Sequence, residues 1–171
     1  MAKDGTKRGG ARIGAGRKKK SLESKILEGK VTDVETKDNE KFKPPKPKEY
    51  ISAKQKMGVE THAAEIYAGT YEWLKERGCA EIVTPQLVEN YAQMIGRHIQ
   101  CEELLNQTGL LAKHPTTGDP IASPFVRMSL DYLKSAQQLW YQIWQIAREN
   151  SIQGVGDSAN DEMEKILRIV K

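Results

Sequence analysis

Apolar residues recur at steps of three and four along three long stretches of the chain, which is the pattern of amphipathic helices. Gly78 follows the first stretch and is placed to end it, because glycine adopts the positive φ of a helix C-terminus without strain. We therefore predict a helix over residues 61–77. Its apolar face consists of Ala63, Ile66, Tyr67, Thr70, Trp73 and Leu74.

The second and third stretches each open with a capping residue followed by proline. Thr84 and Pro85 begin a predicted helix over residues 85–108, which Gly109 closes, and at about 1.5 Å per residue it spans about 36 Å. Ser123 and Pro124 begin the third predicted helix, which runs to about Asn150. The two apolar stripes are Leu87, Val88, Tyr91, Ile95, Ile99 and Leu105, and Val126, Leu130, Leu133, Trp140, Ile143, Ile146 and Ala147.

Residues 110–122 interrupt the helical pattern between these two helices. Two short apolar pieces, 110–113 and 121–122, flank the turn-forming sequence HPTTGD, which predicts a small β-hairpin or a tight loop. Two helices of matched length joined by a short connection pack as an antiparallel pair. The predicted fold class is therefore all-α, a helical domain built on a long antiparallel helical hairpin.

The third helix carries a wide apolar surface in the segment LWYQIWQIA. Trp140, Tyr141 and Trp144 point in different directions around the helix, and one neighbouring helix cannot cover them all. We expect these three side chains to lie at an interface between copies of the chain.

Residues 151–171 contain a glycine-bearing linker and a short amphipathic helix, NDEMEKILRIVK, with Asn160 as its expected cap. A tethered helix of this kind is typical of segments that dock on a partner protein. Packing back onto its own domain is equally compatible with the pattern, since short isolated helices are marginally stable. The residues of its apolar face are Met163, Ile166, Leu167 and Val170.

Positive charge is concentrated at the start of the chain. Residues 1–48 hold 15 Lys and Arg against 7 Asp and Glu, whereas residues 49–171 hold 12 against 16. Residues 1–20 also contain five glycines and no apolar periodicity, which predicts a flexible basic arm.

A weak helical turn begins at Ser21, and a spacer with prolines at 44, 45 and 47 follows it. Proline favours an extended conformation, so the spacer is expected to hold the arm away from the body. A further short helix is expected within residues 51–58. The predicted organisation is a basic arm and spacer over 1–48, a helical oligomerisation core over 49–150, and a linker with a docking helix over 151–171.

The arm has the chemistry of a DNA-binding segment. The concentrated negative potential of a narrow minor groove attracts arginine side chains, and glycines let the backbone approach the DNA closely. Lysines add phosphate contacts, whose strength falls as salt rises. A solubilising tail is the alternative interpretation. The predicted DNA-binding residues are Arg8, Arg12, Arg17, Lys18, Lys19 and Lys20.

Signals for catalysis, metal binding and membrane insertion are weak or absent. The sequence has no P-loop, nucleophile elbow or HExxH motif, so we do not expect an enzyme or a cofactor. Cys79 and Cys101 lack zinc-ligand spacing and are expected to be buried thiols in a reducing cytoplasm. His98 and His114 are interpreted as packed or solvated histidines. The mean hydropathy of −0.64 and the lack of a long apolar run argue against a membrane protein.

The order and spacing of several motifs resemble the small subunit of phage terminase. These are RGGARIGAGRKKK, the proline-bearing spacer, EWLKERG, TPQLVENYA, TGLLAKHPTTGDPIASP and the long helix that follows, and they cover about residues 8–150. The resemblance implies a non-enzymatic factor that forms a ring-shaped homo-oligomer and binds double-stranded viral DNA. It implies that this factor presents the DNA to the terminase large subunit, which holds the ATPase and nuclease. It also implies action in the cytoplasm of the bacterial host and absence from the mature virion.

The arm resembles an AT-hook but departs from it. An AT-hook has Gly-Arg-Pro at its centre, whereas this chain has Gly16-Arg17-Lys18. Without proline the segment is less preorganised for the minor groove, so general DNA affinity is expected rather than a preference for AT-rich sequence. A transcriptional or architectural DNA-binding protein with a basic arm is the alternative function, and a protein-interaction scaffold is a third.

Overall fold

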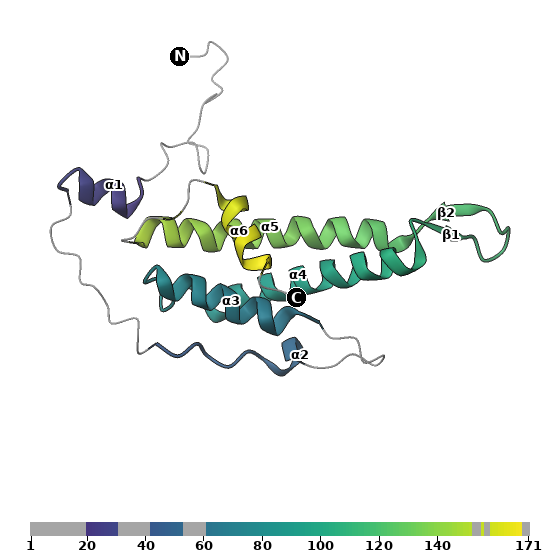
Figure 1. Ribbon diagram of the computed structural model, residues 1–171, viewed down its shortest axis with the longest axis horizontal. Helices are drawn as coiled ribbons and strands as arrows, with labels where there is room; N and C mark the ends of the chain where they lie inside the picture. The colour runs from purple at the N-terminus through teal and green to yellow at the C-terminus, as the bar shows by residue number, and fades with distance from the viewer. Residues whose placement is uncertain (1–19, 31–41, 53–60, 152–154, 156–157, 169–171) are drawn as a thin grey trace, which may run out of the picture.

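The fold was analysed in a computed structural model that describes residues 20–30, 42–52, 61–151, 155 and 158–168. The predicted arm over residues 1–20 lies outside this part of the chain except for Lys20. The described residues form an all-α fold with a small two-stranded antiparallel sheet, as the hydrophobic pattern predicts. Figure 1 shows two long helices side by side, with the shorter helices gathered at one end.

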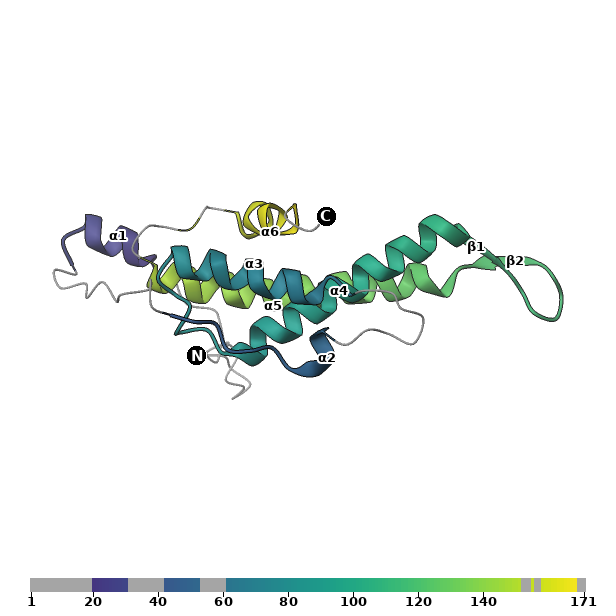
Figure 2. The ribbon, with the colours of Figure 1, turned by 60° about the horizontal axis from the view of Figure 1, so that its bottom comes forward.

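The long antiparallel pair consists of α4 (Pro85–Thr108) and α5 (Pro124–Asn150), with the bounds that the sequence predicts. Strands β1 (Leu111–Lys113) and β2 (Pro120–Ala122) join them as a β-hairpin in which Ala112 pairs with Ile121. This confirms a β-hairpin between the helices. The sheet end of the pair extends beyond the shorter helices (Figures 1 and 2).

Proline, rather than a capping side chain, marks the start of both long helices. Thr84 and Ser123 occupy the cap positions with extended backbones, but neither side chain makes a capping hydrogen bond. Pro85 and Pro124 fit the first turn because their fixed φ is helical and they need no donor partner there. At the other end of α4, Gly109 has φ 83° and donates its amide to Leu105, so the predicted glycine terminus is confirmed.

Helix α3 (Ala63–Glu76) packs on α4 at a close approach made by glycine. A methyl group on Gly96 of α4 would stand 3.2 Å from the Cβ of Ala63 and 3.3 Å from its backbone nitrogen. The first turn of α3 therefore rests directly on the α4 backbone. Gly78 ends the helix region with φ 72°, as predicted.

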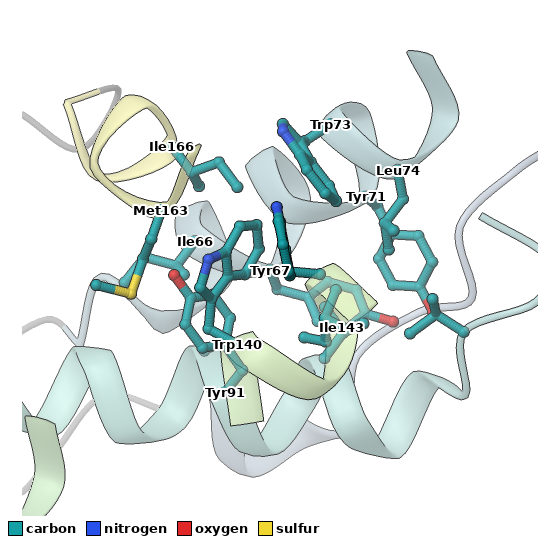
Figure 3. Close-up of a cluster of buried hydrophobic side chains, with 14 of the residues drawn as sticks. Ile66, Tyr67, Tyr71, Trp73, Leu74, Tyr91, Trp140, Ile143, Met163 and Ile166 are labelled. Carbon is teal, nitrogen blue, oxygen red and sulfur yellow. The ribbon is translucent and has the colours of Figure 1, made fainter. Parts of the chain in front are cut away.

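An aromatic core joins α3, α4 and α5 at the end opposite the sheet (Figure 3). Trp140 of α5 lies 5.0 Å from the ring of Trp73 and 5.3 Å from the ring of Tyr91, measured between ring centroids. Rings at these distances and tilts pack favourably beyond their buried area. The fully buried large side chains of this core include Ile66, Tyr71, Leu74, Val88, Tyr91, Ile95, Trp140 and Ile143.

The proline-bearing residues 42–48 of the spacer lie against the body. The prediction that the spacer holds the arm away concerns an arm that lies outside the described residues. Phe42 stacks on Tyr71 with ring centroids 6.1 Å apart, and the hydroxyl of Tyr67 donates to the carbonyl of Pro45 at 3.0 Å. The amide of Lys48 donates to the buried carboxylate of Glu89 at 3.3 Å. An extended proline segment leaves its carbonyls free for such donors, and aromatic side chains of α3 supply the surface.

Two short helices flank this spacer. Helix α1 (Leu22–Leu27) is capped by the hydroxyl of Ser21 and contacts α5, and it matches the predicted weak turn. Helix α2 (Glu49–Ser52) follows the spacer, where Ile51 is buried and its carbonyl accepts from Thr61. The rest of the helix predicted within 51–58 lies outside the described residues.

The last helix, α6 (Ala159–Leu167), begins two residues earlier than predicted. Its cap is Ser158, whose hydroxyl accepts from the amide of Asp161 at 3.4 Å, and not Asn160. Helix α6 packs on α3 and α5. Figure 2 shows it on one side of the helical body, with the spacer and α2 on the other.

Candidate functional site

Five of the six predicted DNA-binding residues, Arg8, Arg12, Arg17, Lys18 and Lys19, lie outside the described part of the chain. The sixth, Lys20, is exposed immediately before α1 and pairs with Glu28. Lys30 contacts the same carboxylate at 2.6 Å. Hydrogen bonds from both lysines hold the pKa of Glu28 below its ordinary value. The charge of Lys20 is therefore partly offset within its own segment.

The three predicted interface residues are divided between core and surface. Trp140 is 1% exposed and Trp144 is 4% exposed, so both belong to the core of the single chain rather than to the predicted interface between copies. The apolar side of α5 is covered by three helices of the same chain, α3, α4 and α6. The prediction considered only one covering helix. Tyr141 is 40% exposed and stacks on Trp144 with ring centroids 5.8 Å apart.

Other exposed apolar side chains gather at the sheet end of the helical pair. Leu110 and Leu111 are each 67% exposed, and Leu130 is 60% exposed. An open groove of about 530 Å³ runs along the outer face of α5 beside Leu130. Its lining mixes apolar residues with Arg127 and Lys134. Exposed apolar surface of this kind is typical of protein interfaces.

The predicted docking face of the last helix is covered by the chain's own core. Met163 is 8% exposed and Ile166 is 2% exposed, and both belong to the apolar cluster (Figure 3). Leu167 packs against that cluster while partly exposed. Val170 lies outside the described residues. The sequence left two interpretations open, docking on a partner protein and packing on the helix's own domain. The structure shows the second.

Glu162 of α6 is a buried carboxylate that binds α3. Its Oε2 accepts from the indole nitrogen of Trp73 at 2.7 Å and from Nη2 of Arg77 at 3.0 Å. Its Oε1 accepts from Lys165 at 2.6 Å. The guanidinium of Arg77 also lies over the ring of Trp73, 4.3 Å from the ring centroid. Charge-assisted hydrogen bonds of this kind are stronger than neutral ones.

The protonation of Glu162 follows from these contacts. Burial alone raises the pKa of the carboxyl group, because it penalises the charged form. The hydrogen bonds from Lys165 and Trp73 and the charge of Arg77 outweigh that effect, and the net pKa lies below the ordinary value. The carboxylate is therefore charged near neutral pH and hydrogen-bonded to Trp73, Arg77 and Lys165.

Ser129, His98 and Glu102 form a polar cluster between α4 and α5. The Ser129 hydroxyl lies 2.8 Å from Nδ1 of His98 and donates to Glu102. Because its single proton goes to the carboxylate, Nδ1 of His98 must be the donor to the serine oxygen. A nucleophilic serine would instead give its proton to the histidine and would be open to substrate, whereas Ser129 is 2% exposed. The cluster joins two helices and has no relay geometry.

Cys79 and Cys101 are buried free thiols, as the sequence predicts. Burial raises the pKa of Cys79 to about 11, which keeps it protonated and unreactive near neutral pH. At the hairpin tip, Nδ1 of His114 accepts from the amides of Thr116 and Thr117 and so orders the turn.

The described ranges contain no group of three His, Cys, Asp or Glu side chains arranged to hold a metal ion. None of the helices there is long and apolar enough to cross a membrane.

Arg77 and Glu162 are functional candidates that the sequence did not single out. Trp73 and Arg77 are four residues apart, so they share a helix face, and this spacing was the available signal. Their acidic partner could not be found, because it lies 85 residues beyond Arg77 and only the fold brings it close.

Comparison with protein-family models, with curated proteins and with solved structures gives no match to this chain. The resemblance to the terminase small subunit therefore depends on the sequence motifs alone.

Proposed function

We propose that this protein is the DNA-binding small subunit of a phage terminase. In this role it performs no catalysis, binds double-stranded viral DNA through its basic arm and presents it to the large subunit in the cytoplasm of the bacterial host. The observation that carries the proposal is the division of charge. A net positive charge is confined to residues 1–48, ahead of an acidic helical body.

Self-association is proposed to use the exposed apolar residues of the helical pair. The outer face of α5 and the sheet end offer Leu110, Leu111, Leu130 and Tyr141 to a second copy. Leu110 and Leu111 lie at the sheet end, and Leu130 and Tyr141 are about three turns apart on α5. A long apolar strip on an elongated subunit is suited to side-by-side packing, which a closed ring requires.

Contact with the large subunit is proposed for the last helix, with one condition set by its packing. Met163 and Ile166 are buried on α3 and α5, so a partner reaches them only when α6 leaves the body. Its exposed face, which carries Asp161, Glu164 and Arg168, is accessible without release.

DNA binding is tested by neutralising three cations of the arm. The triple variant Lys18→Gln, Lys19→Gln and Lys20→Gln is expected to bind duplex DNA more weakly at low salt. If each lysine contacts one phosphate, the slope of log affinity against log salt becomes shallower by about 2.7. Fluorescence anisotropy with a labelled duplex at several salt concentrations measures both quantities.

The matched control changes the same total charge on the body. Lys75, Arg97 and Arg168 lie on α3, on α4 and directly after α6, outside the surface proposed for self-association, and each is at least partly exposed. Their triple replacement by glutamine is expected to leave the salt slope unchanged. An equal loss of slope in both triple variants would assign DNA binding to net charge and overturn the role of the arm.

The oligomeric state separates the proposal from the alternative of a DNA-binding dimer. Light scattering of the full-length protein at micromolar concentration is expected to give a mass of many subunits. A monomer or dimer under these conditions contradicts the ring.

A further inference from the structure

Helix α6 occupies a groove whose walls come from α3 and α5. The α6 groove is defined by Ile66, Gly69, Trp73, Arg77 and Trp140. Gly69 forms its floor, because a methyl group there would stand 3.6 Å from the Ile166 side chain. The indole nitrogen of Trp140 donates to the carbonyl of Ala159, which fixes the first turn of the helix.

The α6 groove has the chemistry of a helix-binding site. It combines an apolar floor with two aromatic side chains and an arginine, which are the residue types that dominate binding energy at protein interfaces. Its polar groups select an acidic ligand, because the donors of Trp73 and Arg77 both point at one carboxylate. A ligand for this groove is therefore an amphipathic helix with a carboxylate one residue before an apolar residue and four before another, as in Glu162, Met163 and Ile166.

The occupant does not use the whole site. Nη2 of Arg77 binds Glu162, but Nε of the same guanidinium is buried without a hydrogen-bond partner among the described residues. Nε and Nη2 form one edge of the guanidinium fork, which a carboxylate can bridge with both oxygens. Glu162 does not do so: its Oε2 accepts from both Trp73 and Nη2 of Arg77, and its Oε1 accepts from Lys165. A helix with a free second oxygen would make one more charge-assisted hydrogen bond.

We propose that the α6 groove is a binding site for an acidic amphipathic helix of another protein, and that α6 occupies it until that helix displaces it. The incoming helix binds more tightly than α6 because its carboxylate accepts hydrogen bonds from both Nε and Nη2 of Arg77. Displacement also frees Met163 and Ile166 of α6. The proposal does not require the chain to bind DNA, so each can fail without the other.

The test uses the full-length protein and a labelled synthetic peptide of residues 158–171. In the wild-type chain the tethered α6 competes with the peptide at a high effective concentration, so binding is weak. Glu162→Lys places a third cation beside Arg77 and Lys165 and is expected to release α6. Hydrogen exchange at residues 159–168 should then accelerate at least tenfold, with exchange in α4 and α5 unchanged. The released chain should bind the wild-type peptide at least tenfold more tightly than the wild-type chain does.

Two peptide variants test separately the need for the Glu162 carboxylate and the additional hydrogen bond to Nε of Arg77. A peptide carrying Glu162→Lys should not bind the released chain, whereas a peptide carrying Lys165→Ala should bind more tightly than the wild-type peptide. Arg77→Met in the released chain should weaken capture at least tenfold. Equal binding of the wild-type and Glu162→Lys peptides, or no gain from Lys165→Ala, overturns the proposal.

A milder variant covers the case in which Glu162→Lys fails to fold, which circular dichroism would reveal. Glu162→Gln keeps the size and one acceptor of the side chain but removes its charge. It should give faster exchange in α6 and increased peptide binding, both smaller than with lysine. Exchange that rises equally in α4, α5 and α6 would mean that α6 opens only when the whole chain unfolds, and would also overturn the proposal.

Discussion

The indole nitrogen of Trp73 donates a hydrogen bond to the carboxylate of Glu162 at 2.7 Å, although the two residues are 89 positions apart in the chain. This contact joins the last helix to the first helix of the core. Both side chains are largely buried, so the bond is shielded from water. The packing of α6 therefore depends on a charged group as well as on apolar area.

The stability that Glu162 confers is expected to fall in acid. Its pKa in the folded protein lies below the ordinary value of 4.5, so the folded state binds its proton less readily than the unfolded state. The contribution is complete above the ordinary pKa and is lost as the pH falls through the lower, folded-state pKa. Urea unfolding at about pH 7 and about pH 3 measures this dependence.

Glu162→Gln is the control for this pH dependence. At about pH 7 it should lower the free energy of unfolding by about 1–3 kcal/mol, because hydrogen bonds to a charged acceptor are replaced by weaker ones. The difference between the wild type and the variant should become smaller as the pH falls from about 7 toward about 3. A difference that stays constant across this range would show that the charge of Glu162 contributes nothing.

Folding and association are expected to depend on different aromatic residues of α5. Trp140→Phe removes a hydrogen bond to Ala159 and leaves space in the core, so it should lower the free energy of unfolding by about 1–3 kcal/mol. Tyr141→Ser should cost less than about 1 kcal/mol, because Tyr141 is largely a surface residue. The tyrosine variant should nevertheless shift light-scattering mass toward smaller species. Unchanged mass would remove Tyr141 from the interface.

The cluster at Ser129 is expected to stabilise the helical pair. Ser129→Ala leaves His98 and Glu102 without their shared partner and should lower the free energy of unfolding by about 1–2 kcal/mol. Ser135→Ala is the matched control on the same helix, since among the described residues the Ser135 hydroxyl donates only to the carbonyl of Asp131 one turn earlier. Equal effects of the two substitutions in chemical denaturation would show that the cluster adds no stability.

Two glycines in helices are expected to respond in opposite directions. Gly96→Leu forces a side chain against the Ala63 backbone and should lower the free energy of unfolding by about 1–3 kcal/mol. Gly69→Ala meets only an Ile166 methyl at ordinary contact distance, so it should gain up to about 1 kcal/mol from helix propensity. Thermal unfolding of both variants measures the difference, and a loss at Gly69 would contradict the packing of α6.

The local pattern of the sequence predicts the helical framework well. Helices α4 and α5 have the predicted bounds because proline and glycine signals at Pro85, Gly109 and Pro124 coincide with a strong apolar period. The β-hairpin follows from turn residues flanked by short apolar pieces. These signals act within a few residues, so they can be read without knowledge of the fold.

The packing between distant segments could not be predicted in the same way. Trp140 was expected at an interface between copies because periodicity does not show how many helices of the same chain cover a face. Residues of α3, α4 and α6 all contact it. The spacer was expected to extend from the body because composition does not reveal that Tyr67 and Tyr71 bind it. The cap of α6 was misplaced by two residues, since Ser158 and Asn160 are both good capping residues.

The docked spacer closes one edge of the aromatic core. Phe42 stacks on Tyr71, and the hydroxyl of Tyr67 donates to the carbonyl of Pro45, so residues 42–48 help to shield these two tyrosines of α3 from water. Removing the ring of Phe42 would uncover that edge of the core to solvent without altering any charge of the chain.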